Sequence, residues 1–345
     1  MADLRPVTQL AAAIEALEIL GPTRYAWLGA AFELPEPVRR LAPPDGRRAA
    51  LVHAIQWRLY ADFFTAGGPT PPPARTTRSR DGRLARALSA ANAGTIRTDP
   101  GWWFVGTDDG RLIVERLGLH MWAVPEEVVP DGPGPLRAGD PVAVRMPSEA
   151  PNFSPGFYMA FSDRGFDPDR PRLLDRFYLH VRATSAVRCM ELTTARLNAA
   201  DLPFRLKVVD EPANFGRCDS AVLTLQRKDR DAALHHVREL RRSLEPGLDA
   251  TVPALTLRLA PGLGFAEDPA GGVSFGAHRC RLIAAALVEA HEAGLTELGD
   301  RMELVRTHMA RANTTPEAPY LGPRSAGEPR LPDHAPLEQE ATTCR

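Results

Sequence analysis

The segment Arg176–Arg182 (Arg-Phe-Tyr-Leu-His-Val-Arg) alternates strictly between two kinds of side chain. Because successive side chains of a strand point to opposite faces of its sheet, the pattern predicts a strand with Phe177, Leu179 and Val181 on one face. The opposite face then carries Arg176, Tyr178, His180 and Arg182. We expect the apolar face to lie in a hydrophobic core and the other face to hold cations and groups that can transfer protons.

Two further segments, Phe204–Val209 and Leu255–Leu259, repeat this pattern. Their polar positions are Arg205 and Lys207 in the first and Thr256 and Arg258 in the second. None of the three segments contains an acidic residue, although a solvated sheet face usually mixes both signs of charge. The pattern therefore favours a surface that binds an anion. The alternative is an ordinary solvated face of an antiparallel sheet, since arginine is abundant in this chain.

Lysine is the more informative basic residue here. It occurs only at positions 207 and 228, so 40 of the 42 basic residues are arginine. Lys228 stands in the run Arg227-Lys228-Asp229-Arg230, which is typical of a solvated loop. Lys207 is therefore the lysine for which a chemical role is the stronger hypothesis.

The pattern along the chain predicts an α+β fold: a helical N-terminal region followed by a mixed domain around a largely antiparallel sheet. Residues 1–100 are expected to be mainly helical, and residues 101–150 to form a β-rich connecting region. Residues 151–312 would form the core that carries the chemistry. Residues 313–345 are rich in Pro, Glu and Thr and are expected to be a disordered tail.

Individual elements follow from hydrophobic periodicity. Helices are predicted at Leu10–Leu20, Ala49–Phe64, Arg83–Asn92, Glu191–Ala200, Arg230–Ser243 and Arg279–Ala293. Strands besides those above are predicted at Trp102–Val105, Leu112–Leu117, His120–Val124, Pro141–Met146 and Ala221–Leu225. The first two of these are joined at Asp108-Asp109-Gly110, a typical hairpin turn. Pro-rich Pro69–Pro73 and Gly-rich Pro261–Gly272 are predicted to be loops.

Two short segments add candidate site residues. Before an apolar strand, Arg217 could contact an oxyanion and Asp219 could orient a neighbouring group; the alternative is a turn closed by the Asp219 and Ser220 side chains. His278 and Arg279 stand at the start of a predicted helix, where free N–H groups and the helix dipole favour an anion. The Gly-rich loop before that helix lacks the spacing of a P-loop.

Composition excludes several classes of protein. The chain has 345 residues, 44% of them hydrophobic, and a net charge of −1, which gives no reason to expect nucleic-acid binding. No apolar run is long enough to cross a bilayer, and Met1–Gln9 lacks the pattern of a secretory signal, so we expect a cytoplasmic protein without membrane contact. The four cysteines (189, 218, 280 and 344) are too far apart for a typical zinc site, so no metal is expected. The motifs of kinases, cysteine phosphatases, serine hydrolases and zinc proteases are absent from the sequence.

Five motifs occur in a fixed order: Gly156–Tyr158, Arg176–Val181, Phe204–Val208, Arg217–Leu223 and Ser274–Cys280. In this combination the chain resembles the HopA-type effector family, over residues 151–293. Biosynthetic members of that family act as lyases in class V lanthipeptide and thioviridamide-like pathways. The resemblance implies a partner, a kinase-like protein, that phosphorylates Ser or Thr of a ribosomal precursor peptide. This chain would then eliminate phosphate from the phosphorylated precursor peptide to give dehydroalanine or dehydrobutyrine, with no metal or organic cofactor.

The site roles follow from the chemistry of elimination and from analogy with phosphothreonine lyase effectors, which use a lysine base, a histidine acid and an arginine-lined phosphate site. Lys207 is the candidate base; a free lysine has a pKa of about 10.4, which burial and neighbouring arginines would lower. His180 is the candidate acid, with Tyr178 or His278 as substitutes. Phosphate would be bound by Arg176, Arg205, Arg217 and Arg279, with Asp219 and His278 in support.

Two other functions remain open from the sequence. A non-catalytic phosphopeptide-binding or effector-like protein would use the same arginines without needing a lysine–histidine pair. A structural component of a biosynthetic complex could recognise a leader peptide through its N-terminal helices and the Trp102-Trp103 strand, although such an aromatic pair is more often core or interface packing.

Overall fold

A six-stranded antiparallel sheet lies at the centre of the computed structural model, which describes residues 6–71, 82–151, 153–167, 173–269 and 273–322. The strands follow the order β13-β14-β10-β12-β11-β9. Their bounds are β9 (Phe157–Phe161), β10 (Leu174–Leu179), β11 (Phe204–Val209), β12 (Ala221–Gln226), β13 (Leu257–Ala260) and β14 (Leu263–Glu267). This arrangement confirms the predicted α+β class and the antiparallel sheet.

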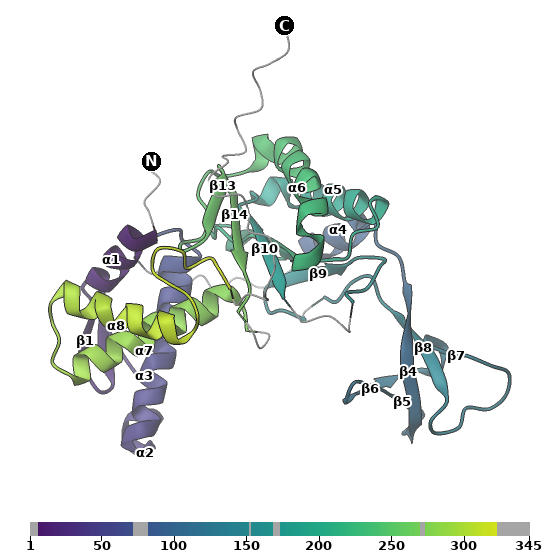
Figure 1. Ribbon diagram of the computed structural model, residues 1–345, viewed down its shortest axis with the longest axis horizontal. Coiled ribbons are helices and arrows are strands. Elements are labelled where there is room, and N and C mark those ends of the chain that lie inside the picture. Colours follow the sequence, from purple (N-terminus) through teal and green to yellow (C-terminus); the bar gives the residue numbers. More distant parts are fainter. Residues whose placement is uncertain (1–5, 72–81, 152, 168–172, 270–272, 323–345) are drawn as a thin grey trace, which may run out of the picture.

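Three helices cover one face of this sheet: α4 (Arg83–Ala91), α5 (Ala186–Ala199) and α6 (Arg230–Leu244) (Figure 1). The core between them contains the apolar positions of the alternating strands, among them Phe177 and Leu206, which are fully buried. The sheet face predicted from alternation to be apolar is therefore the face that packs against helices.

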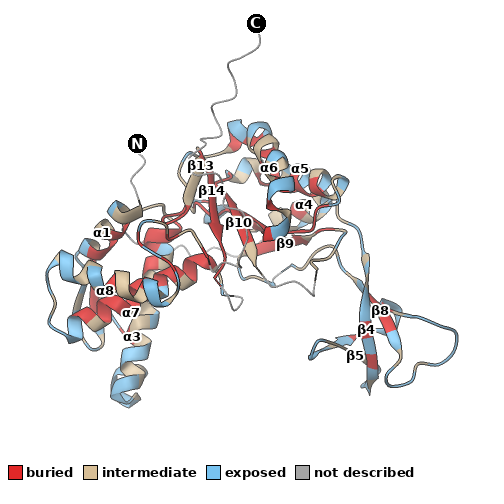
Figure 2. Ribbon diagram, in the orientation of Figure 1, coloured by how far each residue is buried: buried red, intermediate tan, exposed pale blue. Residues whose placement is uncertain are grey.

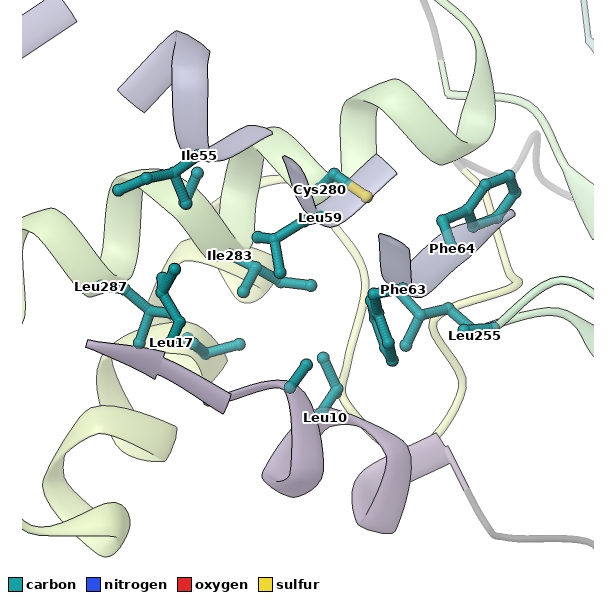
Figure 3. Packing of buried hydrophobic residues seen from close by; sticks show 14 of the residues in the cluster. Leu10, Leu17, Ile55, Leu59, Phe63, Phe64, Leu255, Cys280, Ile283 and Leu287 are labelled. Atoms are coloured by element: carbon teal, nitrogen blue, oxygen red, sulfur yellow. The ribbon is translucent and has the colours of Figure 1, made fainter. Parts of the chain in front are cut away.

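The opposite face meets a second layer built from both ends of the chain. It contains α1 (Pro6–Ala16), α2 (Glu36–Leu41), α3 (Pro44–Leu59), α7 (Phe275–Glu292) and α8 (Leu298–Arg311), with a small sheet of β1 (Leu17–Gly21), β2 (Arg24–Trp27) and β3 (Ala30–Glu33). Helix α3 packs against α7, and α1 packs against α8. Figure 3 shows their shared core, in which Ile55 and Leu59 of α3 lie beside Ile283 of α7. The sheet contributes Tyr178, Val222 and Ala266 to this core.

Helix α3 ends in one turn of π-helix, Tyr60–Phe64. The N–H of Thr65 donates to the carbonyl of Tyr60, the i→i+5 spacing of that turn. Such turns are rare and occur frequently at functional sites. This one brings Tyr60 toward the central sheet, as described below.

A second, five-stranded sheet stands apart from the rest as an arm (Figure 1). Its strands are β4 (Arg97–Asp108), β5 (Arg111–Arg116), β6 (Leu119–Ala123), β7 (Val128–Pro130) and β8 (Pro141–Met146), in the order β6-β5-β4-β8-β7. Its core includes Trp102 and Val114, while most of its residues are exposed (Figure 2). At the β4–β5 turn Asp109 and Gly110 have φ of 46° and 75°, which confirms the predicted hairpin turn with both central residues in the left-handed region.

Several predicted elements differ from the structure. The helix predicted at Leu10–Leu20 ends at Ala16, because Leu17 and Ile19 fit a period of two as well as a helical one and continue as β1. Residues 1–100 therefore contain a small sheet and are not only helical. The loop predicted at Pro261–Gly272 contains β14, a fully buried strand that alternation cannot reveal. Helix α8 was not predicted at all.

The tail is the last difference. Residues 313–322 are ordered against the body of the protein, where Tyr320 packs against the core around α7. The prediction of disorder from Asn313 is therefore wrong for these ten residues, and the rest of the predicted tail lies outside the described residues. Part of the predicted loop Pro69–Pro73 also lies outside them. No helix in the described ranges has the length and apolarity needed to cross a membrane.

Candidate active site

A cavity of about 330 Å³ lies over the central strands, on the face opposite α5 and α6. Three basic side chains, Arg176, Arg205 and Lys207, line it. Three hydroxyl residues, Ser154, Thr224 and Ser274, also line it, together with an apolar wall that includes Met159 and Val222. The cavity therefore combines positive charge with hydroxyl groups and an apolar surface.

Strand pairing explains why these residues meet. Thr224 of β12 pairs with Arg176 of β10 on one side and with Arg205 of β11 on the other. Lys207 pairs with Val222 of β12 and with Met159 of β9. Directly opposite residues of an antiparallel pair point to the same face of the sheet. Arg176, Thr224 and Arg205 therefore form one row across that face, and Val222, Lys207 and Met159 form the next. The cationic face predicted from alternation is therefore confirmed for β10 and β11.

Lys207 lies in an unusual environment for an amine. Its Nζ stands 4.2 Å from the centre of the Phe157 ring, and across the described residues it makes neither a hydrogen bond nor an ion pair. The pKa of Lys207 is lowered to about 8, chiefly by burial; Asp219 and Asp268 oppose this shift, and Arg176 and Arg217 contribute to it. About a tenth of this amine is therefore neutral at pH 7, far more than for a free lysine.

Arg176 is held in place by a carboxylate. Its Nε and Nη2 donate to the two oxygens of Asp268, at 2.5 and 2.7 Å. Asp268 is buried, so the pair forms a rigid, directional contact that fixes the plane of the guanidinium. Arg176 lines the cavity, and its contact with Asp268 fixes its orientation there.

Arg217 and Asp219 form a second pair next to Lys207. The Arg217 Nε and Nη2 atoms donate to the Asp219 carboxylate at 2.5 and 2.9 Å, and the guanidinium stands 4.9 Å from the Phe157 ring. Burial alone would raise the pKa of Asp219, but Arg217 outweighs it and the pKa is lowered. The hydroxyl of Tyr60, from the π-helical turn, lies 3.2 Å from Asp219 and 3.4 Å from Arg217. Tyr60 thus connects the N-terminal layer to this pair.

The N-terminal end of α7 is a further feature that favours binding of an anion. Ser274, the residue before its first turn, lines the cavity. Helix N-termini carry free N–H groups and a partial positive charge. The first turn lies close to Phe64: a Cβ on Gly276 would stand 2.4 Å from that ring, so the position requires glycine.

The structure does not bring His180 to the cavity lining. Strand β10 ends at Leu179, and the His180 Nδ1 lies 3.1 Å from the carbonyl of Thr251, to which it can donate. Its Nε2 lies 3.9 Å from Asp249. Burial lowers the pKa of His180, which favours the neutral ring.

Tyr178 shares the face of Arg176 but is almost completely buried beneath the cavity. Its ring stands 5.9 Å from that of Phe64 in an edge-to-face contact. Burial raises the pKa of Tyr178 well above its ordinary value, so its hydroxyl stays protonated. The side chain packs in the core between the layers and does not line the cavity.

Arg279 and His278 also lie away from the lining. Arg279 is 1% exposed, and its Nε and Nη2 donate to the carbonyls of Pro319 and Leu321, each at 2.7 Å. Its Nη1 lies 2.7 Å from the Nδ1 of His278. Burial and the adjacent Arg279 and Arg281 lower the pKa of His278 to about 4, so this ring is neutral at neutral pH.

Sequence patterns did not reveal four residues of the site: Tyr60, Phe157, Thr224 and Asp268. Thr224 could have been found from the alternation of β12, since it follows Val222 on the same face. Phe157 lies within one of the motifs of the family resemblance. Tyr60 and Asp268 carry no local signal, because their roles come from contacts with Asp219 and Arg176 that are distant in sequence. Among the described residues, no cluster of three or more His, Cys, Asp or Glu side chains is arranged to bind a metal ion.

The family comparison agrees with the HopA-type resemblance read from the sequence. The family model of the HopA1 effector protein family matches residues 148–321. An effector protein structure from Pseudomonas syringae pv. tomato strain DC3000 is 14% identical, with 77% of this chain and 89% of that chain covered and a TM-score of 0.46. A second, from Pseudomonas syringae pv. syringae strain 61, is 15% identical, with 78% and 89% covered and a TM-score of 0.44. No curated protein matches the chain.

The matched residues make up half of the chain and include all six strands of the central sheet, helices α5–α8 and the cavity lining. The chain therefore belongs to the HopA1 effector protein family.

Proposed function

We propose that this protein is a phosphoserine/phosphothreonine lyase that eliminates phosphate from a phosphorylated peptide and leaves dehydroalanine or dehydrobutyrine. The observation that carries the proposal is the amine of Lys207, which is desolvated and unpaired among the described residues, in a cavity that it shares with Arg176 and Arg205. A base that is partly neutral beside cations that bind phosphate is what β-elimination of a phosphomonoester requires.

The reaction has three coupled bond changes. The neutral Lys207 amine takes the proton from Cα of the phosphorylated residue, and the C–H electron pair forms the Cα–Cβ double bond. The Cβ–O bond breaks, and its electrons leave with the phosphate. Phosphate released without a proton is a much stronger base than lysine, so the proton taken by Lys207 passes to it. The products are the dehydroamino acid and hydrogen phosphate, and the lysine is again neutral.

The arginines support the departing group. Arg176 is oriented by Asp268, and together with Arg205 it lines the cavity in which the phosphate would bind. These contacts strengthen as negative charge accumulates on the leaving oxygen. His180, Tyr178 and His278 do not line the cavity, so the proposal assigns stabilisation of the leaving group to the guanidinium groups and to Lys207.

The family resemblance extends the proposal to a pathway. The substrate would be a ribosomally made precursor peptide, phosphorylated by a kinase-like partner protein. The dehydroamino acids would then accept cysteine thiols to form thioether rings.

A direct test uses the purified protein and a synthetic phosphoserine peptide. We expect release of inorganic phosphate together with a peptide that adds a small thiol, as measured by mass spectrometry. Hydrolysis would also release phosphate but would return serine, which adds no thiol. Recovery of serine, or an unchanged phosphopeptide after prolonged incubation, would contradict the proposed reaction.

The pH dependence of kcat/KM gives an independent prediction. Because the pKa of Lys207 in the free protein is about 8, the fraction of neutral base and hence kcat/KM should rise with pH up to about 8 and then level off. Bound phosphate favours the ammonium form, so the rise in kcat should lie at higher pH than the rise in kcat/KM. Steady-state rates between about pH 7 and 9 test this, above the second ionisation of phosphoserine near pH 6. A flat profile over that range would argue against Lys207 as the base.

One observation favours a second candidate, a non-catalytic phosphopeptide-binding protein. The described lining of the cavity holds no histidine that could act as a general acid. A site that only binds phosphate does not need such an acid. In that case the phosphopeptide would bind and remain intact in the same experiment.

A further inference from the structure

The ordered segment after α8, residues 313–322, forms a strap past the end of β14 in the central sheet. On one side Arg279 of α7 binds the strap by donating hydrogen bonds to the carbonyls of Pro319 and Leu321. These two bonds are charge-assisted and almost fully buried, which makes them strong fixing points.

On its other side the strap is bound to the end of β14. The N–H of Glu267 donates to the carbonyl of Tyr320 at 2.8 Å, and the N–H of Gly322 donates to the Glu267 carboxylate at 2.9 Å. The strap thus lies between α7 and β14, with backbone or side-chain bonds to both.

The contact at Gly322 is too close for any other residue. A Cβ built on Gly322 would stand 2.7 Å from the carbonyl oxygen of Asp268 and 3.1 Å from the Cβ of Glu267. The first of these neighbours is backbone and cannot move aside without moving the chain. The strap is therefore in direct contact with Asp268, the residue whose carboxylate binds Arg176.

We infer that Arg279 and the strap are positioning elements that fix Asp268 and, through it, the phosphate-binding guanidinium of Arg176. The path consists of short contacts: Arg279 to Pro319 and Leu321, Gly322 against Asp268, and Asp268 to Arg176. The N–H of Asp268 also donates to the carbonyl of Leu174, two residues before Arg176, at 2.8 Å. This inference rests on the part of the proposed function in which the cavity binds phosphate.

The same contacts argue against a direct role of Arg279 at phosphate, which was the prediction from the sequence. Its three guanidinium nitrogens contact Pro319, Leu321 and His278, and 1% of the residue is exposed. All three nitrogens are occupied, so a ligand would have to replace one of these contacts to bind Arg279. Arg279 acts on the site through the strap.

The test compares two Gly→Ala variants by their affinity for inorganic phosphate, measured by titration calorimetry. Gly322→Ala should push the strap away from Asp268, loosen Arg176 and weaken phosphate binding by about tenfold. Gly299→Ala is the matched control: it lies in the first turn of α8, and no atom stands within 4 Å of the added methyl group, so its affinity should equal that of the wild type. Equal affinity of Gly322→Ala and wild type, or a wild-type protein that binds no phosphate, would overturn the inference.

A second variant covers the case in which Gly322→Ala does not fold. Arg279→Lys keeps the positive charge but cannot donate to both carbonyls in the arginine geometry, and it should weaken phosphate binding in the same direction. Thermal unfolding monitors the fold of each variant. A folded Arg279→Lys variant with wild-type phosphate affinity would overturn the inference as well.

Where the wild type also eliminates phosphate, the pH profile of kcat/KM distinguishes a displaced Arg176 from a general loss of stability. Lower stability alone does not shift the pH at which kcat/KM rises. Arg176 helps to lower the pKa of Lys207, so a displaced Arg176 should shift the rise in kcat/KM of Gly322→Ala to higher pH. Phosphate binding that weakens without any elimination supports the strap and not the lyase. Elimination with unchanged phosphate binding in the variant supports the lyase and not the strap.

Discussion

Replacing Lys207 with alanine should lower kcat for β-elimination by about 10³-fold while phosphopeptide binding stays measurable. General-base groups contribute about 10²–10⁴-fold to a rate, and the chain's other lysine, Lys228, pairs with Asp229 outside the cavity. The arginines that bind phosphate remain in the variant, so its affinity for the phosphopeptide should change far less than its rate. Phosphate release and peptide binding measured on the same preparation separate the two effects.

Lys228→Ala is the control for this variant, because it removes the other lysine of the chain. It should eliminate phosphate at the wild-type rate. Retained activity in Lys207→Ala would reject the assigned base, even if the protein proves to be a lyase.

Loss of activity in the Lys207 variant should come with a gain in stability at neutral pH. The pKa of Lys207 is lower in the folded protein than in the unfolded chain, so the fold disfavours the ammonium form. This destabilisation is complete below pH 8 and disappears as the pH rises through the unfolded value of about 10.4. A residue that costs stability in this way is typical of a functional position.

Replacing Asp175 with alanine should destabilise the protein by about 3–5 kcal/mol. Asp175 is 0% exposed and accepts hydrogen bonds from Arg227 at 3.1 Å and from Arg230 at 2.5 and 2.9 Å. Without it, both buried guanidinium groups lose a carboxylate partner, although Glu267 still pairs with each of them. The free energy of unfolding from urea titration measures the loss.

Glu36→Ala provides the comparison for the Asp175 variant. Glu36 pairs with Arg40 one turn away on an exposed helix, so its removal should change stability by less than about 0.5 kcal/mol. A similarly small effect for Asp175→Ala would mean that the buried network does not hold β10 and β14 to α6.

The sequence contained enough to predict which side of the sheet is cationic, but not which cations meet. Strict alternation in Arg176–Arg182 and Phe204–Val209 determines the faces, because a strand side chain can point only up or down. It does not determine how far the strand continues: β10 ends before His180, which then contacts Thr251. The predicted acid therefore lies away from the predicted base.

Arg176 and Arg279 illustrate the same limit for arginine. Both were predicted to bind phosphate, yet one lines the cavity and the other is occupied by carbonyls about 40 residues further along the chain. Such partners depend on tertiary packing and leave no trace in local spacing. Asp268, which orients Arg176, was hidden for the same reason.

The pairing of α3 with α7 and of α1 with α8 has a consequence for synthesis on the ribosome. The N-terminal helices emerge first but must wait for partners that are translated more than 200 residues later. Until then their apolar sides are open to chaperones and to other nascent chains. The site itself includes two late residues, Asp268, which orients Arg176, and Ser274, which lines the cavity, so newly made protein should acquire its completed site in the last stage of maturation.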